Sequence, residues 1–426
     1  MANKKRTITA AAIVIVLLAV AAFVCYEVFI VKRGWVKTNE GTYYYDNNGN
    51  AYSGLNTMPD GTKRYFDPAT NLMVTGEYQI DGNKYLFDGE GIMQFGVQKT
   101  GGVSKYYDPE SGILKTGWID TEGGKLYFNE ETGDQALGLT VIGGLQYYFD
   151  AQSGLMKTGE IEVDGEKYCF DDTTGAGFDG FYENNGVKHA YMGGKLLRDV
   201  RAYADQHLYY FDSEGEIIRD VDGTKPMVAL TYDDGPSIYT DSILDTFEEY
   251  GQRCTFFIVG DRISWNEDQA RREAAMGCEQ GNHTYSHNRL TDLTAEEMQE
   301  KLKGTDDELI RISGKPSTCL RPPEGKWNDT LKSVCGCPII LWSVDSRDWE
   351  SKNADKICNR VIGHVQDGDI VLMHDLYQST ADATKRIVPS LIEAGFQLVT
   401  VEELGLIKTN GTGLEDGVVY YSIPNR

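Results

Sequence analysis

Hydrophobic and polar positions follow three patterns along the chain, and each pattern predicts a different kind of structure. Residues 1–33 are apolar with basic flanks, and residues 34–223 repeat short aromatic segments between polar turns. Residues 224–405 alternate apolar runs with helical patterns, and the tail at 406–426 contains VVYYSIP, which is typical of an edge strand. Because 426 residues are too many for one ordinary core, we expect several domains with these boundaries.

The first apolar stretch runs from about Ile8 to Val31 and follows a basic cluster at residues 4–6. Roughly 20 apolar residues span a bilayer core as a helix, and basic residues ahead of them favour a cytoplasmic amino terminus. The pattern predicts a short cytoplasmic stub, a transmembrane signal anchor and a single-pass membrane protein with its catalytic part outside the cell. A signal peptide cleaved near residues 19–21, followed by secretion, is the alternative.

Glycines recur every 20 to 22 residues from Gly34 to Gly180, and a ninth unit without this glycine begins near Arg201. Each unit carries a polar turn and then an aromatic segment such as KRYFD or HLYYFD. This pattern is typical of a β-hairpin whose aromatic side chains supply most of the buried area. Because one hairpin is not stable alone in water, we expect stacked neighbours to complete its core as a solenoid.

Beyond residue 224, apolar runs such as MVAL, TFFIVG, PIILW and DIVL alternate with segments of helical period. One helix is predicted by a capping box of Thr294 with Glu297, and it should end near Gly314. Alternating strands and helices predict an α/β domain with a parallel sheet, and their number suggests a distorted (β/α) barrel.

Charge and cysteine content narrow the possible partners. The formal net charge of −24 argues against nucleic acid, which requires a basic face. The eight cysteines include no CxxC pair, and Cys335 and Cys337 are too close in sequence for an ordinary disulfide. We interpret most of them as small buried hydrophobic residues. The sequence does not predict the oligomeric state.

Four polar clusters carry the chemistry of the last domain: TYDDGP, HTYSH, DSRDW and VLMHD. The first and last follow strand-like runs, where α/β barrels place catalytic groups. Asp234, His283 and His287 form a two-histidine, one-carboxylate set, which is typical of a catalytic metal site with open positions. We predict one divalent metal, with zinc favoured and Co²⁺ or Fe²⁺ as alternatives.

The same clusters supply acid and base groups for hydrolysis. A bound divalent cation activates water and polarises a carbonyl group. Asp233 is then free to act as the general base, and His374, at the end of another strand, is the candidate general acid for protonating an amine leaving group. The residues therefore predict a metal-dependent hydrolase.

Five short motifs together resemble the polysaccharide deacetylase family, carbohydrate esterase family four, also called the NodB homology domain. The resemblance implies Asp233 as base, Asp234, His283 and His287 as ligands, and His374 as acid. The remaining implied roles belong to the motifs RPPEG, DSRDW and LMH. Arg321 would hold the catalytic aspartate, Asp348 would tune the acid histidine, and Trp349 and Leu372 would line the acetyl pocket.

One position departs from the family pattern. The family usually has an aromatic residue after the two prolines of RPPEG, where this chain has Glu324. In the family the backbone N–H of that residue helps to hold the tetrahedral oxyanion, and a backbone donor survives substitution. We expect the carboxylate of Glu324 to repel anionic sugars or to reshape the groove.

The repeats resemble the cell-wall-binding repeats of Gram-positive surface proteins, which include choline-binding and glucan-binding types. Choline cages in that family use a Trp after the leading glycine, and here only Trp35 and Trp118 occupy that position. The repeats are therefore interpreted as a wall-contact region for wall polysaccharide or teichoic acid, or as a spacer, with choline binding as the alternative.

Together these observations predict N-deacetylation of an amino-sugar polysaccharide at the cell envelope, with peptidoglycan N-acetylglucosamine as the favoured substrate. Chitin oligomers, exopolysaccharide and O-acetyl xylan are the alternative substrates. A non-catalytic wall-binding surface protein is the alternative from another class, and the complete set of polar residues argues against it.

Overall fold

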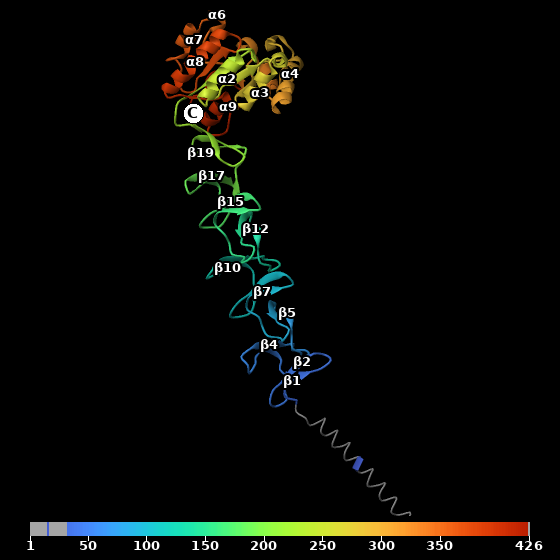
Figure 1. Cartoon of the computed structure of the whole chain (residues 1–426). Helices are drawn as coiled ribbons and strands as arrows, with labels where there is room; N and C mark the ends of the chain where they lie inside the picture. Colours follow the sequence, from blue (N-terminus) through green and yellow to red (C-terminus); the bar gives the residue numbers. More distant parts are fainter. Residues whose placement is uncertain (1–14, 17–31, 425–426) are drawn as a thin grey trace, which may run out of the picture. The chain divides into compact units, whose positions relative to one another are not determined.

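The computed structural model describes residues 15–16 and 32–424 (Figure 1). The described chain forms two compact units. The first unit ends at Asn184 and also takes in Tyr191–Leu196, whereas the second comprises Asn185–Ala190 and the chain from Leu197 onward. The division into two units does not test the domain boundary that the sequence predicts near residue 223, so that boundary stays a prediction.

The first unit is a series of antiparallel β-hairpins, as the repeats predict. The pairs are β1 with β2, β3 with β4, β5 with β6, β7 with β8, β10 with β11, β12 with β13 and β14 with β15. Their bounds, with those of the remaining short strands, are β1 (Gly34–Lys37), β2 (Thr42–Tyr45), β3 (Gly54–Thr57), β4 (Lys63–Phe66), β5 (Gly76–Ile80), β6 (Asn83–Phe87), β7 (Gly96–Thr100), β8 (Val103–Tyr107), β9 (Leu114–Lys115), β10 (Gly117–Thr121), β11 (Gly124–Phe128), β12 (Gly138–Ile142), β13 (Leu145–Phe149), β14 (Gly159–Val163), β15 (Glu166–Phe170), β16 (Gly180–Asn184), β17 (Val187–Met192) and β18 (Lys195–Leu196).

Every one of these hairpins after the first, β1–β2, buries an aromatic ring at the end of its second strand. These rings, each at most 1% exposed, are Phe66, Phe87, Tyr107, Phe128, Phe149 and Phe170. Backbone hydrogen bonds join successive repeats, for example from Met93 N–H to the Lys63 carbonyl at 2.9 Å and from Met156 N–H to the Lys125 carbonyl at 2.9 Å. Because neighbouring repeats are in contact, the stacked hairpins together form the hydrophobic core that a single hairpin lacks.

The second unit contains a parallel sheet with the order β24-β23-β22-β27-β26, and β28 also pairs with β22. Its strands are β19 (Arg201–Ala204), β20 (His207–Phe211), β21 (Ile217–Asp222), β22 (Met227–Asp233), β23 (Thr255–Ile258), β24 (Glu279–Asn282), β25 (Ile339–Ile340), β26 (Val344–Asp345), β27 (Ile370–His374), β28 (Gln397–Leu398) and β29 (Val419–Tyr420). Strand β22 is buried along its whole length, since it lies in the middle of the sheet and carries helices over it.

Helices connect the strands of this sheet, as expected for an α/β domain. They are α2 (Thr240–Glu249), α3 (Glu267–Ala275), α4 (Ala295–Ser313), α5 (Asp329–Val334), α6 (Asp348–Ser351), α7 (Ala354–Val361), α8 (Gln378–Glu393) and α9 (Val401–Lys408), with 3₁₀ turns η1 (Gly260–Trp265), η2 (Leu290–Asp292) and η3 (Pro323–Gly325). The predicted capping box is present on α4, where Thr294 and Glu297 satisfy each other's backbone N–H groups. This helix ends at Ser313 and is capped, as predicted, by Gly314, whose φ of +77° favours glycine.

The last hairpin, β19–β21, shares a core with the α/β domain. Leu208 and Val221 from the hairpin are in one buried cluster with Met227, Phe257 and Leu404. The repeat that begins near Arg201 is therefore packed as part of the second unit, although its sequence pattern belongs to the repeats.

A buried carboxylate fixes this junction. Glu403 is 1% exposed, and it accepts hydrogen bonds from Arg219 at 2.9 and 3.0 Å and from Arg253 at 3.2 Å. Burial alone would raise the pKa of Glu403, but the two guanidinium groups hold it below its usual value. The Arg253 guanidinium also lies 4.5 Å from the ring centroid of Tyr210 on β20.

Replacing Glu403 with Gln should destabilise the second unit by roughly 3 kcal/mol, because two largely buried guanidinium groups lose their counterion. The measurement is urea unfolding of the whole chain followed by tryptophan fluorescence. Glu402→Gln is the matched control, since Glu402 pairs with Arg201 where both side chains are at least one-third exposed, and it should cost less than about 1 kcal/mol. Equal losses in the two variants would contradict the importance of the Glu403 contacts.

The predicted transmembrane helix requires a correction. Among residues 15–16 and 32–424, no helix combines the length and the apolar character needed to cross a bilayer. The longest described helix, α4, has 19 residues but is amphipathic and carries many charges. This finding overturns both the transmembrane element of the fold prediction and the prediction of a single-pass membrane protein. The stretch from Ile8 to Val31 on which they rested lies outside the described residues, apart from Ile15 and Val16.

Candidate active site

The predicted site residues meet where parallel strands β22 and β27 end. Asp233 and His374 are register partners on these neighbouring strands. A cavity of about 450 Å³ opens beside them. Its lining includes Asp233, Asp234, His283, His287, Glu324, Trp349, Leu372 and His374 from the predicted set, together with Gly325, Trp342, Asp345 and Tyr377. Arg321 and Asp348 are completely buried behind this lining.

Asp234, His283 and His287 form a possible metal site, because their ligand atoms all lie within 4.8 Å of one another. The Asp234 Oδ1 atom lies 3.5 Å from His283 Nε2 and 3.3 Å from His287 Nε2. This oxygen is buried without a hydrogen-bond partner, which is costly for a carboxylate unless a cation satisfies it.

Two further features of the histidines fit a metal. The Nδ1 atom of His283 lies 2.6 Å from the Arg321 carbonyl oxygen, which orients Nε2 towards Asp234. Burial lowers the pKa of His283 despite the opposing charges of Asp233 and Asp234, so its imidazole is neutral, the form that binds metals. Asp234 and His287 have φ values of +72° and +53°, so both ligands are held in a left-handed backbone conformation that few non-glycine residues adopt.

Arg321 fixes the orientation of Asp233. Its guanidinium donates to Asp233 Oδ1 at 2.7 Å and to Thr231 Oγ1 at 2.6 Å. Further hydrogen bonds reach the carbonyls of Ile340 at 3.1 Å and Leu341 at 3.0 Å, so each nitrogen of the buried guanidinium has an acceptor. One carboxylate oxygen of Asp233 is thus held, and Oδ2 remains near His283 Nε2, at 3.9 Å.

Asp348 orients His374 in the same way. The Nδ1 atom of His374 lies 2.7 Å from Asp348 Oδ1, and the His374 backbone N–H donates to Oδ2 at 2.7 Å. Thr380 Oγ1 donates to Oδ2 at 2.7 Å as well. Burial by itself would lower the pKa of His374, but the hydrogen bond and charge of Asp348, with smaller contributions from Asp233 and Asp234, raise it to about 9. The imidazolium form therefore predominates at neutral pH and leaves Nε2 available to the cavity.

Asp375 is a buried group to which the sequence analysis assigned no role. It accepts hydrogen bonds from Ser237 Oγ at 3.1 Å and from Thr240 Oγ1, and its backbone N–H donates to the Asp233 carbonyl at 2.8 Å. A Cβ atom at Gly235 would lie 2.5 Å from Asp375 Oδ2, which explains the glycine after the two aspartates. Burial raises the pKa of Asp375 to about 7. The sequence feature that could have indicated a role for Asp375 is its position directly after His374 in the motif VLMHD.

Other contacts were not accessible from sequence spacing. Arg262, 28 residues after Asp234, donates to the Asp234 carbonyl. Thr380 reaches Asp348 across 32 residues, and Tyr377 joins the cavity lining from the loop before α8. These residues come from different elements, so only the fold shows that they belong to the site.

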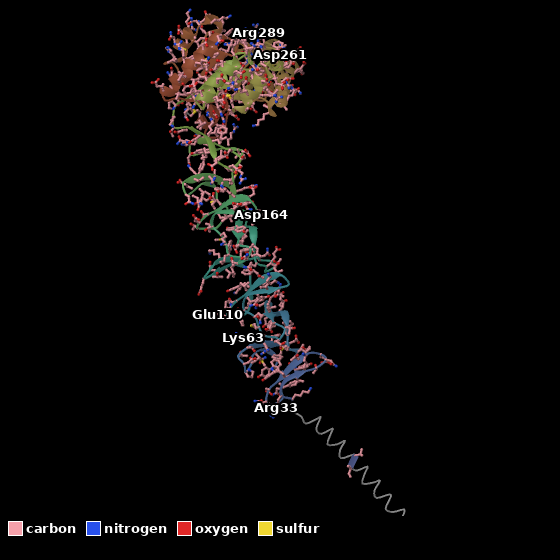
Figure 2. All side chains as sticks on the ribbon, in the orientation of Figure 1. Arg33, Lys63, Glu110, Asp164, Asp261 and Arg289 are labelled. Carbon is pink, nitrogen blue, oxygen red and sulfur yellow. The ribbon has the colours of Figure 1, made fainter. Side chains whose placement is uncertain are left out.

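Glu324 lies in the cavity wall, and its side chain forms ion pairs at the rim. Its carboxylate accepts from Arg289 at 2.6 and 2.7 Å and lies 3.0 Å from Lys326 Nζ (Arg289 is labelled in Figure 2). Hydrogen bonds from Arg289 first, and then from Lys326, lower the pKa of Glu324 to about 2. The cavity wall therefore carries a carboxylate at the position where the polysaccharide deacetylase family usually has an aromatic ring. The exposed side chains of Arg289 and Lys326 pair with this carboxylate.

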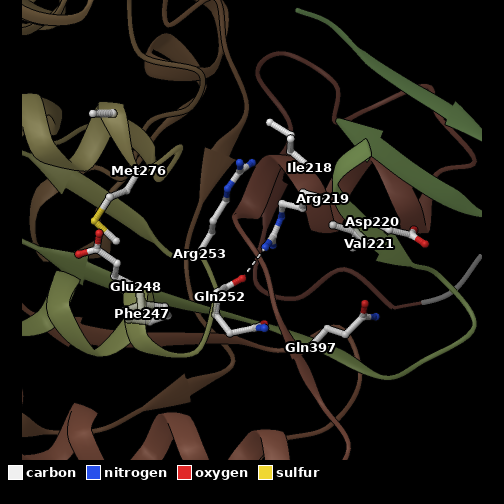
Figure 3. A pocket seen from close by; sticks show the side chains of 12 residues that line it. Ile218, Arg219, Asp220, Val221, Phe247, Glu248, Gln252, Arg253, Met276 and Gln397 are labelled. Carbon is white, nitrogen blue, oxygen red and sulfur yellow. Dashed lines mark hydrogen bonds between the residues drawn. The ribbon is translucent and has the colours of Figure 1, made fainter. Parts of the chain in front are cut away.

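A larger cavity, of about 490 Å³, lies beside the last hairpin (Figure 3). Arg219, Gln252 and Arg253 line it, and Arg219 is already engaged with Glu403 and with the Gly251 carbonyl at 3.1 Å. Its lining contains no histidine and no predicted site residue. The hydrolytic chemistry is therefore assigned to the smaller cavity.

Comparison with known proteins places the chain in a family. The sequence pattern of the polysaccharide deacetylase family matches residues 220–336, and that of the choline-binding repeat matches residues 115–158. A peptidoglycan-N-acetylglucosamine deacetylase of Bacillus cereus is 32% identical over 199 residues, which are 45% of this chain and 93% of that protein. The chain belongs to the polysaccharide deacetylase family, which confirms the resemblance noted from its motifs.

Two further relatives are longer proteins. The peptidoglycan-N-acetylmuramic acid deacetylase PdaC of Bacillus subtilis is 39% identical over 189 residues, which are 44% of this chain and 40% of PdaC. The peptidoglycan-N-acetylglucosamine deacetylase PgdA of Listeria monocytogenes is 35% identical over 182 residues, which are 42% of this chain and 39% of PgdA. The chain thus covers about two fifths of each of these two relatives.

Proposed function

We propose that this chain is a metal-dependent hydrolase that removes N-acetyl groups from cell-wall peptidoglycan, with N-acetylglucosamine as its substrate sugar. The observation that carries the proposal is the meeting of Asp233, the Asp234–His283–His287 set and His374 in one cavity. Relatives named as peptidoglycan deacetylases support the substrate class.

Asp234, His283 and His287 would hold the metal, for which we propose zinc because two imidazoles and one carboxylate leave a position for substrate. When bound, the cation would supply a Lewis acid for the acetyl carbonyl and for water. Co²⁺ and Fe²⁺ are the alternatives that the same donor set allows.

The chain's own residues would carry the proton transfers. Asp233 Oδ2 takes a proton from the attacking water while Arg321 holds Oδ1 in place. The oxygen of this water bonds to the acetyl carbon and gives a tetrahedral oxyanion. The C–N bond of the acetamide breaks when this intermediate collapses, and His374 delivers its Nε2 proton to the departing amine. Asp348 keeps Nδ1 of His374 hydrogen-bonded throughout. The products are acetate and a glucosamine residue.

Trp349 and Leu372 are proposed to enclose the acetyl methyl group. Both line the cavity, and Leu372 is 4% exposed whereas Trp349 is half exposed. A small apolar pocket beside the reacting carbon would select an acetyl group over larger acyl groups. It does not distinguish N-acetyl from O-acetyl, so O-acetyl xylan stays the alternative substrate to be tested.

The repeats are proposed to hold the enzyme on a wall polymer. At Trp118, which is 40% exposed, the rings of Tyr127 and Tyr147 lie with centroids 5.1 Å away, so an aromatic surface is available for a sugar or a quaternary amine. At Trp35 the guanidinium of Arg64 already lies 5.0 Å from the ring centroid. At Trp35, therefore, a side chain of the protein already occupies the place that the quaternary amine of choline would take on the ring.

The test is acetate release by the whole chain from purified peptidoglycan, chitin oligomers and acetylated xylan. We expect release from peptidoglycan that a chelator removes and zinc restores. Release from xylan alone would reject the amino-sugar substrate, and no release from any polymer would favour a non-catalytic wall-binding protein.

Replacing Glu324 with Gln should change the choice between the two peptidoglycan sugars. N-acetylmuramic acid carries a lactyl carboxylate, which the charged wall at Glu324 repels at short range. The ratio of deacetylated muramic acid to deacetylated glucosamine, measured by mass spectrometry of digested peptidoglycan, is expected to rise about fivefold. Arg289→Gln should lower that ratio, because it removes a cation that offsets Glu324. An unchanged ratio in both variants would show that this wall does not select the sugar.

A further inference from the structure

Two thiols of the second unit lie next to each other, and the proposed hydrolysis uses neither of them. Cys254 comes directly before β23 and Cys278 directly before β24, and their Sγ atoms are 3.9 Å apart. Both are free thiols. The Glu279 N–H donates to the Cys254 carbonyl at 3.0 Å, so the pairing of the two parallel strands already includes this position.

The backbone at this pair suits a disulfide. Neighbouring strands of a sheet lie about 4.8 Å apart, and a disulfide joins Cα atoms that are about 4.4 to 6.8 Å apart. The residues that follow the two cysteines, Thr255 and Glu279, are register partners. The bond therefore closes by rotation of the two side chains, and the strands can stay where they are.

The two thiols differ in their access to solvent. Cys278 is 7% exposed and helps to line a cavity of about 340 Å³, together with Tyr210, Arg253 and Lys315. Cys254 is completely buried in the hydrophobic core and does not line this cavity. A small reagent can therefore reach the sulfur of Cys278, whereas it meets Cys254 only after it has reacted with Cys278.

The electrostatic surroundings also favour Cys278 as the reacting thiol. The guanidinium of Arg253 (labelled in Figure 3) lies over the preceding residue, since a Cβ atom at Gly277 would lie 2.7 Å from Arg253 Cζ. A hydrogen bond from the Cys254 thiol, with a smaller contribution from the charge of Arg253, holds the pKa of Cys278 below its usual value despite burial. Burial raises the pKa of Cys254. Because the thiolate is the nucleophile in sulfur chemistry, Cys278 attacks first.

We propose that Cys278 and Cys254 form a thiol–disulfide exchange site for small organic disulfides, with Cys278 as the attacking thiol and Cys254 as the resolving thiol. The Cys278 sulfur bonds to one sulfur of the small disulfide and releases the other half as a thiolate, which leaves a mixed disulfide. The Cys254 sulfur then bonds to the Cys278 sulfur and releases the second half. The protons of the two cysteines go to the two released thiolates. The protein thiols are thus oxidised to one disulfide, and the small disulfide is reduced to two thiols.

The new bond would join β23 to β24 at the edge of the sheet opposite the active site. Strand β24 ends at Asn282, directly before the metal-ligand residue His283, whereas Cys278 lies before its start. The disulfide would therefore stabilise the strands that carry this loop without contact with the reacting groups. A wall enzyme works outside the cytosol, where disulfides persist, but the exchange chemistry itself does not depend on the proposed function.

The test is peptide mapping of the folded whole chain after incubation with bis(hydroxyethyl) disulfide and alkylation of the remaining thiols. We expect a cross-link between the Cys254 and Cys278 peptides that dithiothreitol removes. In Cys254→Ala, Cys278 should instead keep one hydroxyethylthio group, whereas in Cys278→Ala the thiol of Cys254 should stay unmodified. Cys358, which is 1% exposed, is the internal control and should remain unmodified in the folded chain.

The melting temperature gives a second measurement. The cysteines are 24 residues apart in sequence, so the cross-link should raise the Tm of the second unit by roughly 5 to 10 °C, with the rate of acetate release unchanged. A cross-link that forms only in denaturant, or a hydroxyethylthio group on Cys254 in folded Cys278→Ala, would overturn the proposal. Should an alanine variant fail to fold, the unsubstituted chain still gives the first of these results. Absent acetate release from every glycan would reject the deacetylase proposal and leave the cross-link result as it stands.

Discussion

Asp233→Asn should lose nearly all turnover, by roughly 100- to 10,000-fold in kcat, while the metal stays bound. The amide cannot take the proton from water at the position where Oδ2 lies near His283. The ligand set Asp234, His283 and His287 is untouched by this change. The measurement is the rate of acetate release from peptidoglycan, together with the metal content of the purified variant.

Asp234→Asn is the matched control at the neighbouring position. It replaces the carboxylate whose Oδ1 lies 3.3 and 3.5 Å from the two histidines with a neutral amide, a much weaker metal ligand, so this variant should lose both metal and activity. If Asp233→Asn retained more than about one tenth of the rate, Asp233 would not be the base. If it lost its metal, Asp233 would belong to the ligand set.

Asp348→Asn should shift the alkaline side of the pH profile as well as lower the rate. His374 donates a proton only in its protonated form, so activity falls as pH rises through the pKa of His374. Asp348 contributes most to raising that pKa to about 9 against the effect of burial. With the charge removed, the pKa should fall towards the ordinary value of about 6.5, and the alkaline limb of kcat/KM should move to lower pH by roughly two units.

Thr380→Val separates the charge of Asp348 from its hydrogen-bond network. It removes one hydrogen bond to Oδ2 at 2.7 Å but keeps the carboxylate next to His374. The alkaline limb should therefore move much less than in Asp348→Asn. An alkaline limb that stays in place in Asp348→Asn would show that His374 is not the acid whose titration limits the reaction.

Local patterns were sufficient to predict the elements. The glycine period predicted the hairpins, because a φ such as the +77° of Gly76 is a local requirement that glycine meets. The capping box at Thr294 and the end at Gly314 were equally local. The transmembrane prediction also used a local property, the hydropathy of one window, but the described helices do not support it.

Contacts between distant elements could not be read from the sequence. No spacing shows that Arg219 and Arg253 meet at Glu403, or that Thr380 reaches Asp348. Asp233 and His374 could each be placed at the end of a strand, but their side-by-side register depends on which strands are neighbours in the sheet. Strand order is set by packing of the whole domain, so it appears only in the fold.

The last hairpin, β19–β21, determines where the repeats can be separated from the α/β domain without loss of stability. Leu208 and Val221 belong to the same buried core as residues of β22. A recombination event that joined a foreign binding module at residue 224 would remove both side chains and expose part of the core of the α/β domain. A viable crossover point, in evolution or in a laboratory fusion, is therefore expected ahead of Leu197. The catalytic half would then inherit one repeat with every new partner.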